Sequence, residues 1–163
     1  GFITMKPNLK RGSQILAMIT LVLSLFSASA FAGMSNGTEN SAPVMGGYDP
    51  VSYFETDKPM RGNGHYSAVY NGGTYLFANK THKKMFEANP KKYAPQFGGY
   101  CAYGVAKGKK FYSDPTTWAV INRKLYLNLD KNIQKKWNNG MKSHIAQAQT
   151  NWKDIEHKNP SEL

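Results

Sequence analysis

Cys101 is the only cysteine of the chain, and it lies in residues 97–103, which read FGGYCAY. With no second cysteine, the thiol cannot form a disulfide within the chain. It is therefore packed in the core, bound to a metal ion, or chemically reactive. A thiolate would suit copper(I) or zinc, with help from an imidazole. The two glycines before it allow the backbone to approach a bound group closely.

Other side chains are candidates to share a binding site with this thiol. The ligand-binding candidates that would line a small cleft with it are Cys101, Tyr48, Asp49, Tyr100 and Tyr103. In the alternative interpretation the rings form a polar-tipped aromatic core, and Asp49 only caps a helical turn that begins at Pro50. The candidate metal ligands are Cys101 and His82. Both His82 and His65 are nevertheless expected at the surface, the usual place for a histidine that binds nothing.

Several classes of site are excluded by the residues that are missing. A single cysteine rules out a Cys-x-x-Cys redox pair and a haem-attachment motif. The sequence contains no phosphate loop, no His-Glu-x-x-His and no Gly-x-Ser-x-Gly. After Cys101 the next histidine is His144 and the next methionine is Met141, so the close spacing of a blue-copper site is absent. These exclusions favour a binding protein over an enzyme.

The N-terminal residues have the pattern of a secretory signal peptide. Three basic residues precede an apolar core at residues 15–26 and a small-residue cleavage site near Ala30-Ala32. An apolar run of about 12 residues is short against the roughly 20 that a membrane span needs. We expect a signal peptide at residues 1–32, of which 1–4 are an N-terminal scar or upstream residues, and a flexible leader at 33–45. The mature protein is then periplasmic or secreted.

The chain is basic, with a formal net charge of +11 that falls to +8 without the three basic residues of the signal peptide. Its lysines are scattered rather than gathered in one dense run, which is typical of a solvated basic surface. We expect no nucleic-acid partner for an exported protein of this kind. Peripheral contact with an anionic membrane surface is an alternative. The protein partner, if there is one, stays unknown.

Two β-hairpins are predicted from aromatic and β-branched runs on either side of turn residues. Residues 65–70 and 74–78 flank an Asn-Gly-Gly turn, and residues 118–121 and 125–129 flank a second turn. No internal repeat is apparent beyond these two hairpins. With helices between and after them, the expected fold class is α+β: a small single domain of short antiparallel hairpins with packed helices.

Helices are predicted between the hairpins and at the C-terminus. Thr81 is expected to cap the first, and Asp130 a long C-terminal amphipathic helix. Gly140 inside the latter costs about 1 kcal/mol relative to alanine, so a kink or break there is compatible with the pattern. The apolar stripe of the long helix is Ile133, Trp137, Met141, Ile145, Ala148 and Trp152. The folded domain is expected over residues 46–155, followed by a polar tail at 156–163.

The spacing of one group of aromatic residues is specific. Tyr75-x-Phe77 follows a glycine pair, and Phe86, Pro90 and Tyr93 come after it. Together with residues 47–51, which read GYDPV, this pattern resembles the YHS domain family over residues 47–103. The resemblance implies a hairpin and a helix like those of treble-clef-like metal-binding modules. The GGYCA stretch and the tryptophan-bearing C-terminal part resemble an exported branch of that family.

The chain departs from this family at the metal ligands. Metal-binding YHS modules have cysteines where this chain has Ser52, Ala78 and His82, so only His82 could still bind a metal. We therefore expect an exported YHS-like binding module that takes a small ligand or a soft metal ion, copper or zinc, around Cys101. The alternatives are a structural or protein-interaction module with a buried, inert thiol, and a thiol redox sensor or enzyme.

Overall fold

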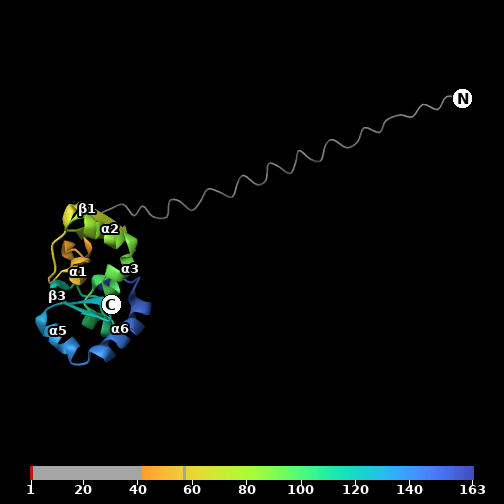
Figure 1. The fold of residues 1–163 in the computed structure, drawn as a ribbon. Helices are drawn as coiled ribbons and strands as arrows, with labels where there is room; N and C mark the ends of the chain where they lie inside the picture. The colour runs from red at the N-terminus through yellow and green to blue at the C-terminus, as the bar shows by residue number, and fades with distance from the viewer. Residues whose placement is uncertain (2–41, 57) are drawn as a thin grey trace. The chain divides into compact units, whose positions relative to one another are not determined.

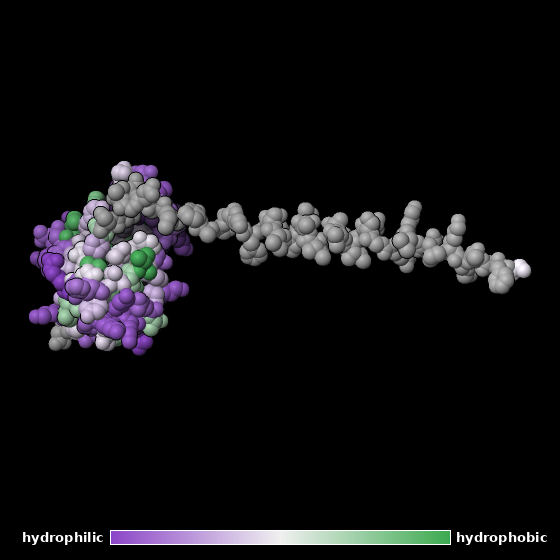
Figure 2. All heavy atoms as spheres, turned by 90° about the horizontal axis from the view of Figure 1, so that it is seen from above, coloured by the Kyte–Doolittle hydropathy of each residue, from purple (hydrophilic) through white to green (hydrophobic). Residues whose placement is uncertain are grey.

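The structure is a computed structural model, and it describes Gly1 and residues 42–163 except Asp57. Apart from Gly1, the predicted signal peptide lies outside the described residues, and so does the predicted leader up to residue 41. In the part that is described, no helix combines the length and the apolar character needed to cross a membrane. The face drawn in Figure 2 is mostly hydrophilic, with hydrophobic atoms only in small patches.

The elements fall into two series that follow each other along the chain (Figure 1). The first series is η1 (Val44–Gly47), α1 (Ser52–Glu55), β1 (Asn63–Tyr70), β2 (Gly73–Phe77), α2 (Lys80–Ala88) and α3 (Pro90–Tyr93). The second series is η2 (Gln96–Gly99), α4 (Ala102–Ala106), β3 (Asp114–Ile121), β4 (Lys124–Asn128), α5 (Lys131–Asn138) and α6 (Met141–Ile155), and the short turn η3 (Pro160–Glu162) follows it. The α+β class and both predicted hairpins are confirmed.

The two series are an internal repeat, which we call the first repeat (residues 44–93) and the second repeat (residues 96–155). Each contains one two-stranded antiparallel sheet, and the two sheets have the same register when residue numbers are shifted by 51. Tyr75 pairs with Ala68 as Tyr126 pairs with Ala119. The irregularity in the ladder also falls at the same place in both. The copies share short identical stretches, Gly-Gly-Tyr at residues 46–48 and 98–100 and Ala-Val-x-Asn at residues 68–71 and 119–122. The sequence analysis missed the repeat because most other positions differ and the offset between the copies changes from 52 to 51 residues.

The caps and turns that begin the helices have the same geometry in both repeats, although the residue types differ. Asn79 caps α2 by accepting a hydrogen bond from the third helical N–H, and Asp130 caps α5 in the same way. Before each first helix, a 3-10 turn places one bulky residue and two glycines at positive φ. The angles are 58°, 59° and 80° for residues 45–47 and 56°, 60° and 84° for residues 97–99. Glycine adopts such angles without steric cost, so the Gly-Gly pairs are conformational requirements.

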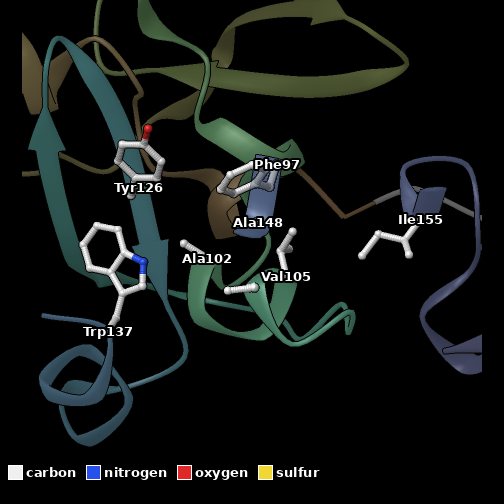
Figure 3. Close-up of a cluster of buried hydrophobic side chains, with 8 residues drawn as sticks. Phe97, Ala102, Val105, Tyr126, Trp137, Ala148 and Ile155 are labelled. Atoms are coloured by element: carbon white, nitrogen blue, oxygen red, sulfur yellow. The ribbon is translucent and has the colours of Figure 1, made fainter. Parts of the chain in front are cut away.

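Buried side chains form three hydrophobic clusters. The first repeat contributes one cluster with Phe77 and Phe86 at its centre, and the second contributes another that includes Phe97, Tyr126 and Trp137 (Figure 3). The third cluster contains buried residues of both repeats, namely Met45, Tyr53, Leu125 and Leu127. Because this cluster is shared, the two repeats are packed as parts of one folded body.

Two helix predictions need correction. The C-terminal helix is not continuous: α5 ends at Asn138 and α6 begins at Met141, with Gly140 as its N-cap. The same break separates α2 from α3, where Asn89 precedes a proline. The cap of α2 is Asn79 rather than Thr81, because the helix begins at Lys80, two residues earlier than the pattern indicated.

The two ends of the predicted domain also take part in the packing. Met45, in the predicted leader, is buried in the shared cluster. In the predicted polar tail, Leu163 packs against the cluster of the second repeat, and the backbone carbonyls of Glu156 and Lys158 accept hydrogen bonds from Lys110 Nζ. The segment after residue 155 is therefore held by specific contacts.

Candidate functional site

Asp49 is a fully buried carboxylate, placed where η1 leads into α1. Its Oδ1 accepts a hydrogen bond from the Val51 N–H at 2.9 Å, which is the helix-capping role that the sequence predicts. Its Oδ2 makes two further contacts: it accepts a hydrogen bond from the Ala78 N–H at 2.9 Å, and it lies 2.6 Å from Nδ1 of His82. The cap is thus also the centre of a network that joins three elements of the first repeat.

His82 is held by this carboxylate. A carboxylate accepts hydrogen bonds, so Nδ1 of the ring carries the proton and donates it to Asp49. Nε2 then keeps its lone pair for another partner. Only 12% of the His82 side chain is exposed, so the prediction of a surface histidine is wrong. The reason is the buried carboxylate, which comes from a position 33 residues earlier and leaves no trace in the local helical pattern.

Ser52, Ala78 and His82 all contact Asp49. The Ser52 hydroxyl donates to the Asp49 carbonyl at 2.6 Å, and the Ala78 N–H and His82 reach the carboxylate. The structure brings His82 to Asp49, a contact that the sequence analysis did not foresee.

Cys101 lies in the second repeat and is 1% exposed. It is the N-cap of α4, where its Sγ accepts a hydrogen bond from the Gly104 N–H at 3.5 Å. The thiol in turn donates to Oδ1 of Asn128, at 3.6 Å. Burial raises the pKa of the Cys101 thiol, although hydrogen bonds from nearby backbone N–H groups oppose this. The thiol is therefore held protonated in the core.

Asp49 and Cys101 occupy equivalent places, because the turns that precede them match when residue numbers are shifted by 52. Each accepts a backbone N–H at the start of a short helix. The counterpart of His82 on the next helix is Ile133, as both are the third helical residue and donate their N–H to the cap. The second repeat thus forms the same fold with a thiol and an aliphatic side chain in place of the carboxylate and the imidazole.

The three candidate tyrosines have separate surroundings. The ring of Tyr48 lies under the Arg61 guanidinium, with 4.9 Å between its centroid and Cζ. Tyr100 contacts an aromatic group that includes Trp152, and the ring of Tyr103 contacts His144. The hydrogen bonds of Asp49 are with the first repeat and those of Cys101 with the second. The structure therefore divides the five predicted ligand-binding residues among different places.

One further residue beside Cys101 was missed by the sequence analysis. Asn128 is fully buried at the end of β4, and its Oδ1 accepts a hydrogen bond from the Tyr103 N–H in addition to the thiol. Its position corresponds to Phe77 in the first repeat. Recognising the repeat would have drawn attention to it, because a buried amide replaces a buried ring.

We expect the thiol to be unreactive in the folded protein. In the absence of denaturant, 5,5′-dithiobis(2-nitrobenzoate) should label Cys101 only as fast as the protein unfolds, because the reagent attacks an exposed thiolate. The raised pKa adds a pH dependence. The unfolded chain loses the thiol proton at lower pH than the native protein, so stability should fall as the pH rises past the usual cysteine range of about 8.5. Rapid, complete labelling of folded protein would contradict the prediction that the thiol is unreactive.

Comparisons with known proteins do not add to this geometry. No protein-family model, no curated protein and no solved structure matches the chain. Within the described residues, no group of three or more histidine, cysteine, aspartate or glutamate side chains is arranged to hold a metal ion. The resemblance to the YHS domain family accordingly stays a proposal that rests on its motifs.

Proposed function

We propose that the chain is an exported, YHS-like binding module without catalytic activity, and that its binding group is the imidazole of His82. The comparison between the repeats carries this proposal. The second repeat folds with Cys101 and Ile133 at the positions of Asp49 and His82, so the fold itself requires neither a carboxylate nor an imidazole there. A buried ionisable pair that the equivalent positions of the second repeat lack is a candidate for function.

The chemistry of the pair suits a borderline metal ion such as copper(II) or zinc. Metal-binding histidines usually donate their other ring N–H to a carboxylate, which fixes the tautomer and raises the basicity of the ligating nitrogen. Asp49 holds His82 in that way, at 2.6 Å. With a single protein ligand supplied by the described residues, the ion would retain water molecules or share ligands with a small molecule or a partner. We therefore expect modest affinity.

The thiol is a weaker candidate than the imidazole. A thiolate ligand must be deprotonated and reachable, whereas Cys101 is buried and its pKa is raised. The alternative of an inert, packed thiol therefore suits Cys101 itself. Export is part of the proposal on the strength of the signal-peptide pattern in residues 1–32.

Titration of zinc and copper(II) into protein purified without a His-tag from the periplasmic fraction tests the proposal. Intact mass checks the removal of residues 1–32. We expect one ion to bind per chain, and His82→Asn to weaken binding at least tenfold, because its amide can still donate to Asp49 while the ligating nitrogen is lost. Circular dichroism verifies that each variant is folded.

Two controls distinguish the possible sites. His65→Asn removes an exposed imidazole of the same repeat, and Cys101→Ser removes the thiol; both should leave the affinity within about twofold. Loss of binding in Cys101→Ser alone would transfer the site to the thiol. Equal binding by the parent and His82→Asn, or no binding by the parent, would reject the proposal.

A further inference from the structure

A surface cavity of about 390 Å³ lies in the second repeat, where the end of α4 faces the N-terminal half of α6. Its lining residues are Lys107, Ser143, His144, Ala146, Gln147 and Thr150. None of them is acidic. The cavity therefore presents a lysine ammonium, two hydroxyl groups, an amide and an imidazole, with no carboxylate among its lining residues to neutralise the ammonium.

The ring of Tyr103 holds the two ionisable groups of the cavity close together. Lys107 Nζ lies over this ring, 5.2 Å from its centroid, and the His144 ring meets it edge-on with 5.1 Å between centroids. Asn151 fastens the two helices by donating from Nδ2 to the Val105 and Ala106 carbonyls at the end of α4. The walls of the cavity are thus fixed before any ligand binds, which lowers the entropic cost of binding.

The hydrogen bonding of His144 defines what its ring can offer. Nδ1 lies 2.9 Å from the Trp137 carbonyl oxygen, which can only accept, so Nδ1 carries a proton. In the neutral ring, Nε2 then has a free lone pair. A ligand next to Lys107 can therefore place a charged oxygen at the ammonium and donate an O–H to Nε2 of the imidazole.

The first repeat shows how the corresponding positions behave when an anion is supplied by the chain itself. Lys107, Ser143 and His144 correspond to Glu55, Lys92 and Tyr93. There the Glu55 carboxylate accepts hydrogen bonds from Lys92 Nζ at 3.2 Å and the Tyr93 hydroxyl at 3.0 Å, which lower its pKa. In the second repeat the carboxylate is replaced by a lysine, and in the described part of the chain no ion pair involves Lys107.

We propose that this cavity binds a small anionic molecule through a phosphate or carboxylate group, with its charged oxygen at Lys107 and a hydroxyl at Nε2 of His144. The site is independent of the His82 site, because it lies in the other repeat and shares no residue with it. A hydrogen phosphate carries both a charged oxygen and an O–H, and so do many hydroxycarboxylates. Either group would supply the negative charge that Glu55 provides in the first repeat.

Titration of inorganic phosphate and of citrate, monitored by amide NMR shifts at constant ionic strength set with chloride, tests this inference. We expect saturable shifts at Ser143 and His144 with at least one of the two probes; which probe binds identifies the class of ligand. Lys107→Gln should weaken binding about tenfold, the effect of losing one charge-assisted contact. The matched control is Lys109→Gln, which removes an exposed lysine two residues away and should change the affinity less than about twofold.

A second variant keeps the result interpretable. His144→Asn retains a donor for the Trp137 carbonyl and removes Nε2, so it should also weaken the binding of the probe while the spectrum stays that of a folded protein. Equal weakening by Lys107→Gln and Lys109→Gln would overturn the proposal in favour of general attraction to a basic surface. The absence of saturable shifts with both probes would overturn it as well.

Discussion

Replacing Trp137 by alanine should lower the free energy of unfolding by about 3–5 kcal/mol, the range for large aromatic side chains in a packed core. The side chain is fully buried on α5, and its ring packs against Tyr126 with 5.5 Å between centroids. Alanine would leave a cavity in the second-repeat cluster, where Trp137 lies beside Tyr126 (Figure 3). This is a large fraction of the roughly 5–15 kcal/mol that stabilises a domain.

Phe86→Ala should have an effect of similar size, because Phe86 is the counterpart of Trp137 in the first repeat and packs between Tyr75 and Phe77. Denaturant melts followed by both fluorescence and circular dichroism measure the two effects. Val69→Ala is the control; this side chain is 73% exposed on β1, and we expect a change below about 0.5 kcal/mol. If Phe86→Ala melted like the parent, the helix register described for α2 would be wrong.

The second large effect is expected at Asp49. Asp49→Ala should cost about 3–5 kcal/mol, because it removes a fully buried carboxylate that accepts hydrogen bonds from two backbone N–H groups and from the His82 ring. Leaving several buried donors without a partner costs more than the loss of one surface hydrogen bond. Urea melts at neutral pH measure the difference.

The equivalent position in the other repeat is the matched control. Cys101→Ala removes a weak sulfur acceptor, and we expect a cost of about 1–2 kcal/mol from the lost packing and the lost cap. His82→Ala should cost about 1–3 kcal/mol, since the carboxylate keeps its two backbone donors. Equal destabilisation by Asp49→Ala and Cys101→Ala would show that the network around Asp49 adds nothing to a simple cap.

Local sequence patterns were sufficient for the elements and for the inward direction of the main aromatic residues. Both hairpins form where the turn residues indicated, and Trp137, in the predicted apolar stripe, is buried. Phe77 and Phe86 are buried too, at positions that the strand and helix periods direct inward. Strand and helix periods determine which face of an element is buried once it packs. These features depend on neighbours within a few residues, so a single sequence contains them.

The candidate site depends on contacts that a local pattern cannot contain. Asp49 contacts Ala78 and His82, which lie 29 and 33 residues later in the sequence. The apolar period of α2 does not indicate that a carboxylate lies beside the first turn of this helix. The internal repeat escaped detection although Gly-Gly-Tyr and Ala-Val-x-Asn occur in both copies, because most of the other positions differ. The same packing positions accept Phe86 in one copy and Trp137 in the other, because volume and burial matter there more than identity.

The shared cluster makes the domain resemble a dimer whose two subunits have been joined in one chain. In a dimer of identical chains every substitution appears twice, so a polar group introduced for function must be tolerated at both copies of its position. Here the two copies are encoded separately, and one turn carries Asp49 while the other carries Cys101. Since Met45 and Tyr53 pack with Leu125 and Leu127, the two copies remain one folding unit while their surfaces are free to differ.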